Sequence, residues 1–356
     1  MKMKSTIYLI SLLVLTSFSC KGNETTAPDQ MQEQVSPAKK SNAFTVNGRL
    51  KLSGTNMVNQ KGIPVQLRGM STHGLQYRGN CYSEQSLNVL MNDWGADILR
   101  ISMYVQEGGY EKDPVKFTAF VDDLVEKCFK EGIYALIDFH MLDPGDPNYN
   151  TDRAKVFFEH VSKKHSAKGN VIYEICNEPN NKQLDVTWAV IKRYADQIVP
   201  IIRKNDPQSI VIVGTPEYAS RPDLVIGNKL AFENIMYTMH FYAAENFQSN
   251  HQGRRMGYVA KAIENGIPVF VTEFGTQNGW GDGENDFDMS AKWLKFLADH
   301  KISWCNWNYS DSPLSGAVWK TGTCPNGPWT DDNLKESGKW IKQNLISPVD
   351  EWSKTP

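Results

Sequence analysis

The sequence predicts an α/β protein built as a (β/α)8 TIM barrel, with a short β-hairpin before the first barrel strand. Apolar runs of strand length recur eight times, and segments with helical spacing separate them over about 280 residues. The expected strands are rich in β-branched and aromatic residues and cover 65–70, 98–103, 134–139, 171–176, 210–213, 235–241, 269–274 and 304–307. A doubly wound sheet would require a glycine-rich phosphate loop after its first strand, and the sequence has none there.

Turn and helix signals lie before and between these strands. Asn47-Gly48 stands between apolar residues in the segment 44–50 and predicts the hairpin turn, which would close the bottom of the barrel. The barrel domain is expected to span residues 44–346, with a C-terminal tail at 347–356. Helical spacing is clear in two sets of residues, Phe117, Phe120, Val121, Leu124, Val125 and Phe129, and Trp188, Ile191, Tyr194, Ala195 and Ile198.

The first 20 residues have the layout of an export signal. A basic start precedes an apolar segment at 7–15 that is too short to span a bilayer. The end of this segment resembles a bacterial lipoprotein signal, in which Cys20 would become the lipidated first residue of the mature protein. Residues 21–43 are polar and predict a flexible tether. The alternative is ordinary secretion with Cys20 removed, so the expected location is the outer membrane or cell surface, or otherwise the periplasm or medium.

Composition and charge exclude several classes of function. The net charge is −2 with both signs mixed along the chain, so no basic patch supports nucleic-acid binding. Ten Trp, 14 Tyr and 15 Phe are a generous supply of aromatic residues, most of which are expected in the core, and polysaccharide clefts also use flat aromatic faces. The acidic loop 282–286 lacks the spacing of a calcium loop. We therefore expect neither a metal nor a cofactor.

The cysteines after Cys20 lack the paired spacing of a metal site. Cys176 and Cys305 lie in apolar runs and are predicted to be buried thiols. Cys81 and Cys324 are candidates for a disulfide in an exported protein, but their spacing does not identify the partner of either.

Two of the predicted strands end near a glutamate. The run 171–176 leads into Asn177-Glu178-Pro179, and the run 269–274 contains Glu273. Barrels hold their chemistry at the carboxyl ends of the strands, so Glu178 and Glu273 should face one cleft. Glu174 lies four residues before Glu178, roughly 13 Å deeper at the strand rise per residue. That depth predicts an interior ion pair and a structural role for Glu174.

Other polar and aromatic side chains share the same predicted rim, namely His73, Arg100, Tyr104, Asp138, His140, His240, Tyr242 and Trp307. Two carboxylates with an arginine, imidazoles and aromatic rings are typical of glycoside hydrolysis. One carboxyl group must protonate the leaving oxygen, and the other must be ionised to attack the anomeric carbon. We predict Glu178 as the acid and then the base, and Glu273, kept ionised by Arg100, as the nucleophile.

The motifs around these residues resemble glycoside hydrolase family 5, most closely the bacterial endoglucanases of its subfamily 2. The resemblance covers about residues 44–345 and includes Gly-Met-Ser-Thr-His-Gly-Leu-Gln at 69–76, Leu-Arg-Ile-Ser-Met-Tyr at 99–104, Ile-Asp-Phe-His at 137–140, 171–180, 236–242, Val-Thr-Glu-Phe-Gly at 271–275 and Asn-Trp-Asn at 306–308. It implies a retaining endo-β-1,4-glucanase, with carboxyl groups ~5–5.5 Å apart rather than the ~6.5–9.5 Å of an inverting enzyme.

The resemblance also implies roles for the residues around the two glutamates. Asn177 would bind the 2-hydroxyl of the sugar in the −1 subsite, while Arg100 and Tyr242 would hold the nucleophile. Trp307 would stack on that sugar. The −1 region would be lined by His73, Tyr104, His140 and His240. The expected partner is a β-1,4-glucan chain, and the protein is expected to be a monomer.

Three positions depart from the family pattern. Tyr77 and Tyr218 stand where the family has Trp, and Ser312 stands where it commonly has Lys. These positions serve flanking subsites, so the same mechanism on mixed-linkage glucan, xyloglucan, mannan or chitosan is an alternative. A second alternative is a non-catalytic glycan-binding surface lipoprotein. That alternative predicts the loss of an acid, whereas Glu178 and Glu273 are both present.

Overall fold

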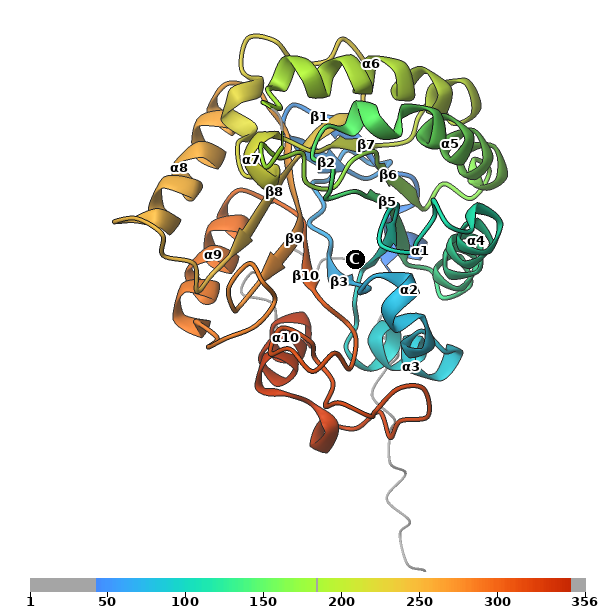
Figure 1. Cartoon of the computed structure of the whole chain (residues 1–356), viewed down its shortest axis with the longest axis vertical. Helices are drawn as coiled ribbons and strands as arrows, with labels where there is room; N and C mark the ends of the chain where they lie inside the picture. Colours follow the sequence, from blue (N-terminus) through green and yellow to red (C-terminus); the bar gives the residue numbers. More distant parts are fainter. Residues whose placement is uncertain (1–42, 184, 347–356) are drawn as a thin grey trace, which may run out of the picture. The chain divides into compact units, whose positions relative to one another are not determined.

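The computed structural model describes residues 43–183 and 185–346, and it shows the predicted closed barrel of eight parallel strands (Figure 1). The hydrogen-bonded order is β10-β3-β4-β5-β6-β7-β8-β9. Each predicted run overlaps one strand: β3 Arg68–Ser71, β4 Ile98–Tyr104, β5 Tyr134–His140, β6 Val171–Glu174, β7 Val211–Val213, β8 Ile235–Tyr242, β9 Val269–Gly275 and β10 Trp304–Trp307. The predicted signal and tether, except Ala43, and the predicted tail lie outside the described residues.

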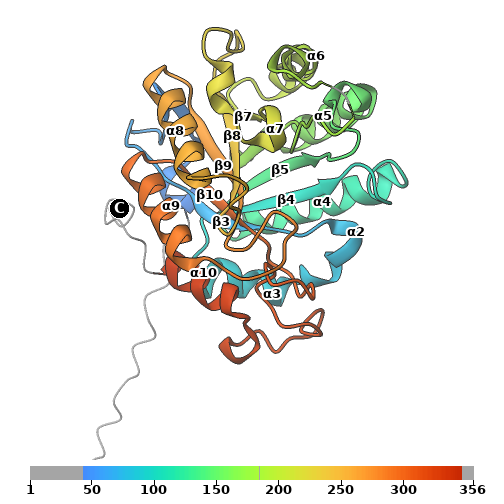
Figure 2. The same ribbon diagram turned by 60° about the vertical axis from the view of Figure 1, so that its left-hand side comes forward.

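Helices alternate with the strands and surround the barrel (Figure 1 and Figure 2). Their bounds are α1 Ala43–Asn47, α2 Leu75–Arg78, α3 Glu84–Asn88, α4 Pro114–Lys130, α5 Thr151–His165, α6 Trp188–Asn205, α7 Pro216–Ala219, α8 His251–Glu264, α9 Phe287–Asp299 and α10 Glu336–Ile346. The start of α4 shows why it forms there, because the Asp113 side chain accepts a hydrogen bond from Lys116 N and Pro114 fits the first turn. Helices α4 and α6 contain the two sets of residues with predicted helical spacing.

The N-terminal hairpin is present, but its predicted turn was wrong. Strands β1 Lys51–Ser53 and β2 Asn56–Val58 pair antiparallel around Gly54. The Asn47-Gly48 pair instead ends helix α1, where Gly48 has φ +64° in the left-handed region. A helix end and a hairpin turn both require positive φ, so the same dipeptide is compatible with either structure. The segment still covers the amino end of the barrel, because Leu50 and Met57 pack with its interior residues.

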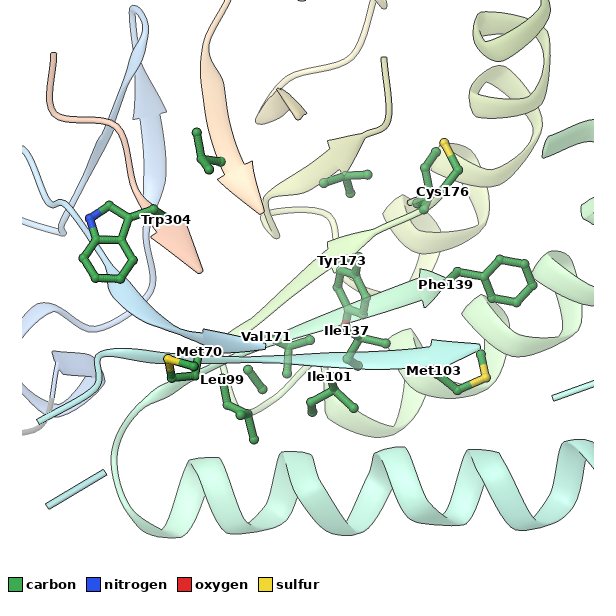
Figure 3. Packing of buried hydrophobic residues seen from close by; sticks show 14 of the residues in the cluster. Met70, Leu99, Ile101, Met103, Ile137, Phe139, Val171, Tyr173, Cys176 and Trp304 are labelled. Atoms are coloured by element: carbon green, nitrogen blue, oxygen red, sulfur yellow. The ribbon is translucent and has the colours of Figure 1, made fainter. Parts of the chain in front are cut away.

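The barrel strands are buried on both faces. Outward-facing residues pack between the barrel and its helices, and Figure 3 labels ten of them: Met70, Leu99, Ile101, Met103, Ile137, Phe139, Val171, Tyr173, Cys176 and Trp304. Inside the barrel, an apolar layer near the amino end contains Ile98, Leu136, Ile172 and Cys305. Two residues further along their strands, Arg100, Asp138 and Glu174 are fully buried polar groups. The interior therefore changes from apolar to polar toward the carboxyl rim.

Strand β9 contains an irregularity that controls the direction of its side chains. Thr238 pairs with Phe270, whereas His240 pairs with Glu273, so the register shifts by one residue between them. As a result both Thr272 and Glu273 point into the barrel, where Thr272 Oγ1 contacts Glu174 and Glu273 contacts Arg100. Strict alternation would have turned one of the two side chains outward. The bulge therefore places Glu273 at the rim without moving Thr272 from the interior.

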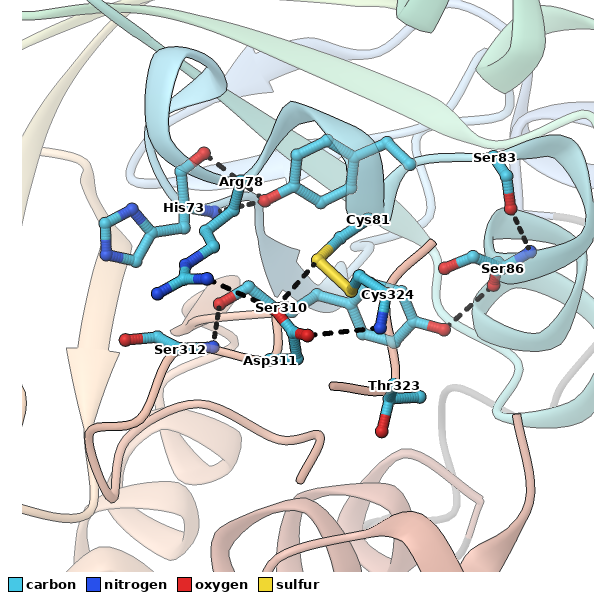
Figure 4. The surroundings of a disulfide bond; sticks show 12 residues. His73, Arg78, Cys81, Ser83, Ser86, Ser310, Asp311, Ser312, Thr323 and Cys324 are labelled. Atoms are coloured by element: carbon cyan, nitrogen blue, oxygen red, sulfur yellow. Dashed lines mark hydrogen bonds and ion pairs between the residues drawn. A yellow bond between two sulfur atoms is a disulfide. The ribbon is translucent and has the colours of Figure 1, made fainter. Parts of the chain in front are cut away.

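Cys81 and Cys324 form a disulfide with each other, with their Cα atoms 4.9 Å apart. The bond joins the short helix Gly79–Cys81 to the long loop that follows β10 (Figure 4). Cys176 and Cys305 are buried free thiols, as predicted. Within residues 43–183 and 185–346, no helix has both the length and the apolar character of a membrane span.

Candidate active site

Glu178 and Glu273 lie together at the carboxyl rim of the barrel. Glu178 comes from the segment that follows β6, and Glu273 from β9. One carboxylate oxygen of each glutamate and one ring nitrogen of His240 all lie within 4.8 Å of one another. The structure thus brings the two predicted acids to one place, with the His240 imidazole beside them.

Arg100 connects the residues around Glu273. Its guanidinium is fully buried, and Nη1 donates to Glu273 Oε2 at 2.8 Å while Nε donates to Glu174 Oε2 at 2.8 Å. Nη2 contacts Asn177 Oδ1 at 2.6 Å and Asp138 Oδ2 at 2.9 Å. Burial acts to lower the pKa of Arg100, but the surrounding carboxylates raise it well above its usual value. Arg100 is therefore a permanent cation inside the barrel.

Glu273 is held at both of its oxygens. Tyr242 donates its hydroxyl to Oε1 at 2.6 Å, and Arg100 occupies Oε2. Burial acts to raise the pKa of Glu273, but the positive charges of His240 and Arg100 outweigh burial and keep this pKa below its ordinary value. Glu273 is thus an ionised carboxylate in a fixed orientation.

Glu178 has the opposite balance. Burial raises its pKa, and the negative charge of Glu273 raises it further. Its hydrogen bond with His240 Nδ1, at 2.8 Å, acts in the other direction. Two neighbouring carboxyl groups whose pKa values are pushed apart can take the separate roles of acid and nucleophile.

His240 joins Glu178 to the interior of the barrel. Its Nε2 lies 2.8 Å from Thr272 Oγ1, whose own hydroxyl donates to Glu174 Oε1 at 2.6 Å. Because that hydroxyl proton is engaged with Glu174, Nε2 must be the donor to Thr272. Burial acts to lower the pKa of His240, but the charge of Glu273 and the neighbouring carboxylates of Glu174 and Glu178 raise it to about 9.

The depth predicted for Glu174 was wrong, although its predicted ion pair is present. His240 Nε2 lies 3.8 Å from Glu174 Oε1, while Nδ1 of the same ring contacts Glu178. The two glutamates therefore lie on opposite edges of one imidazole, closer than four strand residues would place them. The reason is that β6 ends at Glu174, so the chain no longer rises at strand spacing before Glu178.

Replacing His240 with asparagine should move both limbs of the pH profile to higher pH. The His240 cation lowers the pKa of Glu273 and of Glu178, so its loss raises both values. Activity rises with pH as Glu273 ionises and falls as Glu178 loses its proton, so both limbs follow. The measurement is kcat/KM against pH, with His160→Asn on α5 as a control. Unchanged limbs would contradict the assigned charge of His240.

A closed ring of hydrogen bonds fixes the tautomer of His140. Arg100 can only donate, so the oxygen of the Asn177 amide must face it and the amide nitrogen then faces His140 Nε2 at 3.3 Å. Nε2 is therefore the acceptor, and the ring proton lies on Nδ1, which donates to Asp138 Oδ2 at 2.6 Å. The same oxygen contacts Arg100 and closes the ring. Burial and the charge of Arg100 lower the pKa of His140 to about 3, so the ring is neutral.

Asp138 is the member of this ring whose removal tests it. Burial raises the pKa of Asp138, but Oδ2 makes both contacts, so its acceptor role holds in either protonation state. We expect Asp138→Ala to lower kcat about tenfold to hundredfold, because Nδ1 loses its acceptor and the tautomer is released. Asp138→Asn keeps an acceptor and should retain most activity. If Asp138 acts through His140, the double variant should lose little more activity than His140→Ala alone. A double variant whose loss in kcat equals the two single losses combined would contradict this role of Asp138.

Comparison with known proteins identifies the family. A family model described as cellulase (glycosyl hydrolase family 5) matches residues 58–313. The chain belongs to glycoside hydrolase family 5. It is 46% identical over 308 residues to endoglucanase E-5 of Thermobifida fusca and to endoglucanase MaCel5A of a Microbulbifer species, covering 84% of this chain in both cases. These matches span 64% and 58% of the two relatives, so the chain accounts for somewhat less than two thirds of their length.

Solved structures of family 5 proteins share the fold. A crystal structure of the catalytic domain of the Thermobifida fusca endoglucanase, as a variant in complex with cellotetraose, has a TM-score of 0.82 at 44% identity and covers 86% of this chain and 100% of that one. Cellulase Cel5C_n has a TM-score of 0.82 at 42% identity, with 87% and 95% covered. The predicted membership of family 5 is thereby confirmed.

Aromatic rings surround the glutamates of this family 5 site. Tyr104, Tyr242 and Trp307 form one buried cluster at the rim. The His140 ring is stacked on Tyr104 at 4.0 Å between centroids and lies nearly parallel to Trp307 at 5.5 Å. His73 lies 5.3 Å from Trp307. The predicted lining residues His73, Tyr104 and His140 are therefore packed together around Trp307.

The three departures from the family 5 pattern lie further out. Tyr77 is half exposed, donates its hydroxyl to Glu107 Oε2 at 2.7 Å and meets the rings of His73 and Tyr104 edge-on. Tyr218 is also exposed, and its backbone N–H donates to Pro179 O at 3.0 Å, next to Glu178. Ser312 is buried in the loop after β10. Two of these positions thus present an aromatic ring to solvent beside the site.

Some functional residues were not predicted. Thr272 links His240 to Glu174, and Asp138 holds His140, yet neither was assigned a role from the sequence. Asp138 carried a usable signal, because it lies two residues beyond the interior Leu136 on the same strand. Thr272 carried the same kind of signal, because it lies two residues beyond the interior residue Phe270 on the same strand.

Proposed function

We propose that the chain is a retaining endo-β-1,4-glucanase that hydrolyses internal bonds of cellulose-type glucans. The observation that carries this proposal is the pair Glu178 and Glu273, with carboxylate oxygens within 4.8 Å and pKa values shifted in opposite directions. A retaining mechanism requires carboxyl groups about 5–5.5 Å apart, whereas an inverting one needs room for a water between them. The endoglucanases among its relatives and the cellotetraose bound to one of them support a β-1,4-glucan substrate.

In the first step Glu178 donates its proton to the glycosidic oxygen as that bond breaks, and a Glu273 oxygen forms a bond to the anomeric carbon from the opposite face. Tyr242 and Arg100 hold Glu273 in line for this attack. In the second step the ionised Glu178 takes a proton from water, whose oxygen displaces Glu273. Two inversions return the original configuration. Asn177, whose side chain Arg100 contacts at 2.6 Å, would bind the 2-hydroxyl.

The test is reducing-sugar release from carboxymethylcellulose, barley mixed-linkage glucan, xyloglucan, glucomannan and chitosan. Strongest release from carboxymethylcellulose or barley glucan would support the endoglucanase. Activity confined to another backbone would keep the mechanism and assign the preference to Tyr77, Tyr218 and Ser312. Proton NMR of the first product should show the β-anomer, and an initial α-anomer would overturn retention. Binding of glucan with no release from any substrate would support a glycan-binding protein instead.

We further propose that the chain is exported and carries a lipid on Cys20. The disulfide between Cys81 and Cys324 supports export, because such bonds persist in oxidising compartments. Labelling cells with a radioactive fatty acid should mark the unsubstituted chain and not Cys20→Ser. A chain that is released unlabelled into the periplasm or the medium would support ordinary secretion.

A further inference from the structure

Arg78 has hydrogen-bond donors without protein acceptors. It is the last residue of α2, directly after Tyr77, and about a third of its side chain is exposed. Among the described residues its guanidinium makes one ion pair, from Nη1 to Asp311 Oδ1 at 3.5 Å. A guanidinium carries five N–H donors. Most of these donors therefore have no acceptor among the described residues, in contrast to the fully engaged Arg100.

The position of Arg78 connects it to the active site. Figure 4 shows its side chain between His73 and Ser312. Burial and then the charge of Arg78 lower the pKa of His73 to about 4. His73 in turn contacts Trp307 at 5.3 Å between centroids. Arg78 is thus one side chain away from the aromatic surface of the site.

Asp311 contacts Arg78 through a single long ion pair, which leaves the other guanidinium donors of Arg78 without a partner from Asp311. The carboxylate of Asp311 is buried, and its Oδ2 accepts the backbone N–H groups of Gly322 and Cys324 at 3.0 and 3.1 Å. Only Oδ1 faces Arg78, at a long distance. The disulfide at Cys324 anchors this loop (Figure 4). A guanidinium held in this way has less freedom to lose when a ligand binds.

The other cation in this sector is already engaged. Lys335 Nζ donates to the backbone oxygens of Ser312 and Leu314. Lys335 therefore closes the loop after β10, whereas the contacts of Arg78 with the described residues leave several of its donors free. The charge of Asp311 beside Arg78 favours neutral hydroxyl groups over an anionic substituent.

We propose that Arg78 is a substrate-binding residue that donates hydrogen bonds to two adjacent hydroxyl oxygens of the glucosyl unit next to the one at Trp307. The planar fork of a guanidinium can address two neighbouring oxygens at once. This inference rests on the proposed glucanase function and adds a residue of this chain to its flanking subsite. No motif in the sequence identified Arg78 as a residue that contacts substrate.

The experiment uses calorimetry to measure the affinity for cellotetraose of two proteins. One is the single variant Glu273→Gln, and the other is the double variant Glu273→Gln, Arg78→Ala. We expect a loss of about tenfold or more, because a bond to a charged donor disappears. Arg78→Lys should give an intermediate affinity, since it keeps the charge but not the fork. A glucose-configured iminosugar with a single ring fills only the −1 subsite. Its affinity, measured with Glu273 intact, should be the same for the unsubstituted chain and for Arg78→Ala.

Arg49→Ala is the matched control, because Arg49 is a partly exposed, ion-paired arginine that contacts the segment after α5 rather than the rim. Equal cellotetraose affinity with and without Arg78 would overturn the proposal. Equal loss for both ligands together with a lower melting temperature would also overturn it, by showing a structural role. Neither outcome depends on turnover, whereas the proposed function fails when the unsubstituted chain releases no reducing sugar.

Discussion

Replacing Glu273 with alanine should abolish turnover of β-glucan while oligosaccharide binding persists. The covalent intermediate cannot form without this carboxylate, and losses of about 10⁴- to 10⁶-fold in kcat are typical when a nucleophile is removed. Glu273→Gln should lose a similar factor, because it keeps the shape but not the charge that Arg100 and Tyr242 orient. The measurements are kcat on barley glucan and calorimetric affinity for cellotetraose.

Sodium azide distinguishes loss of the nucleophile from misfolding. In Glu273→Ala a small anion can enter the vacated space and attack an activated aryl glucoside once, giving the α-glycosyl azide. Glu245→Gln is a suitable control, because Glu245 is a partly buried carboxylate after β8 that pairs with Arg255 at 2.9 Å. Substantial residual glucan hydrolysis, or a β-glycosyl azide, would refute the assignment of Glu273.

Glu178→Ala should lose about 10²- to 10⁴-fold on glucan and little on a dinitrophenyl cellobioside. A natural sugar leaving group needs the proton that burial and the charge of Glu273 keep on Glu178. Dinitrophenolate leaves without protonation, so its release isolates attack by Glu273. Steady-state kcat/KM on both substrates makes the comparison.

The second half of the reaction gives an independent check on Glu178. Without a general base the glycosyl-enzyme accumulates, and azide should accelerate its breakdown to the β-glycosyl azide, the opposite anomer to that from Glu273→Ala. Equal losses on glucan and on the dinitrophenyl substrate would argue against Glu178 as the acid.

The barrel could be predicted because its parallel strands are buried on both faces and so appear as continuous apolar runs. Strand β8 shows this best, since all eight of its residues are buried. Short-range turn chemistry was less reliable. Asn47-Gly48 ends a helix instead of forming the hairpin turn, because both structures require the same backbone conformation at Gly48.

The candidate site was predicted from strand ends, and its errors arose where strands stop being regular. Alternation failed after Glu174, where β6 ends, and across Thr272 and Glu273, where the register shifts. The pairing of Cys81 with Cys324 depends on a contact between residues 243 positions apart, which spacing cannot reveal. The hydrogen bonds among Arg100, Asn177 and His140 likewise depend on the closed barrel.

The contacts of Arg100 have an evolutionary consequence. One guanidinium joins side chains from β5, β9 and the end of β6, so a single change among them leaves a buried charge without its partner. We therefore expect these residues to be retained together during evolution, because a protein with only one of them substituted would lose stability. Tyr77 and Tyr218 are exposed residues of two separate short helices, α2 and α7, and can change one at a time. Substrate preference should therefore change through substitutions at these two exposed positions, while the residues around Arg100 and the reaction mechanism stay the same.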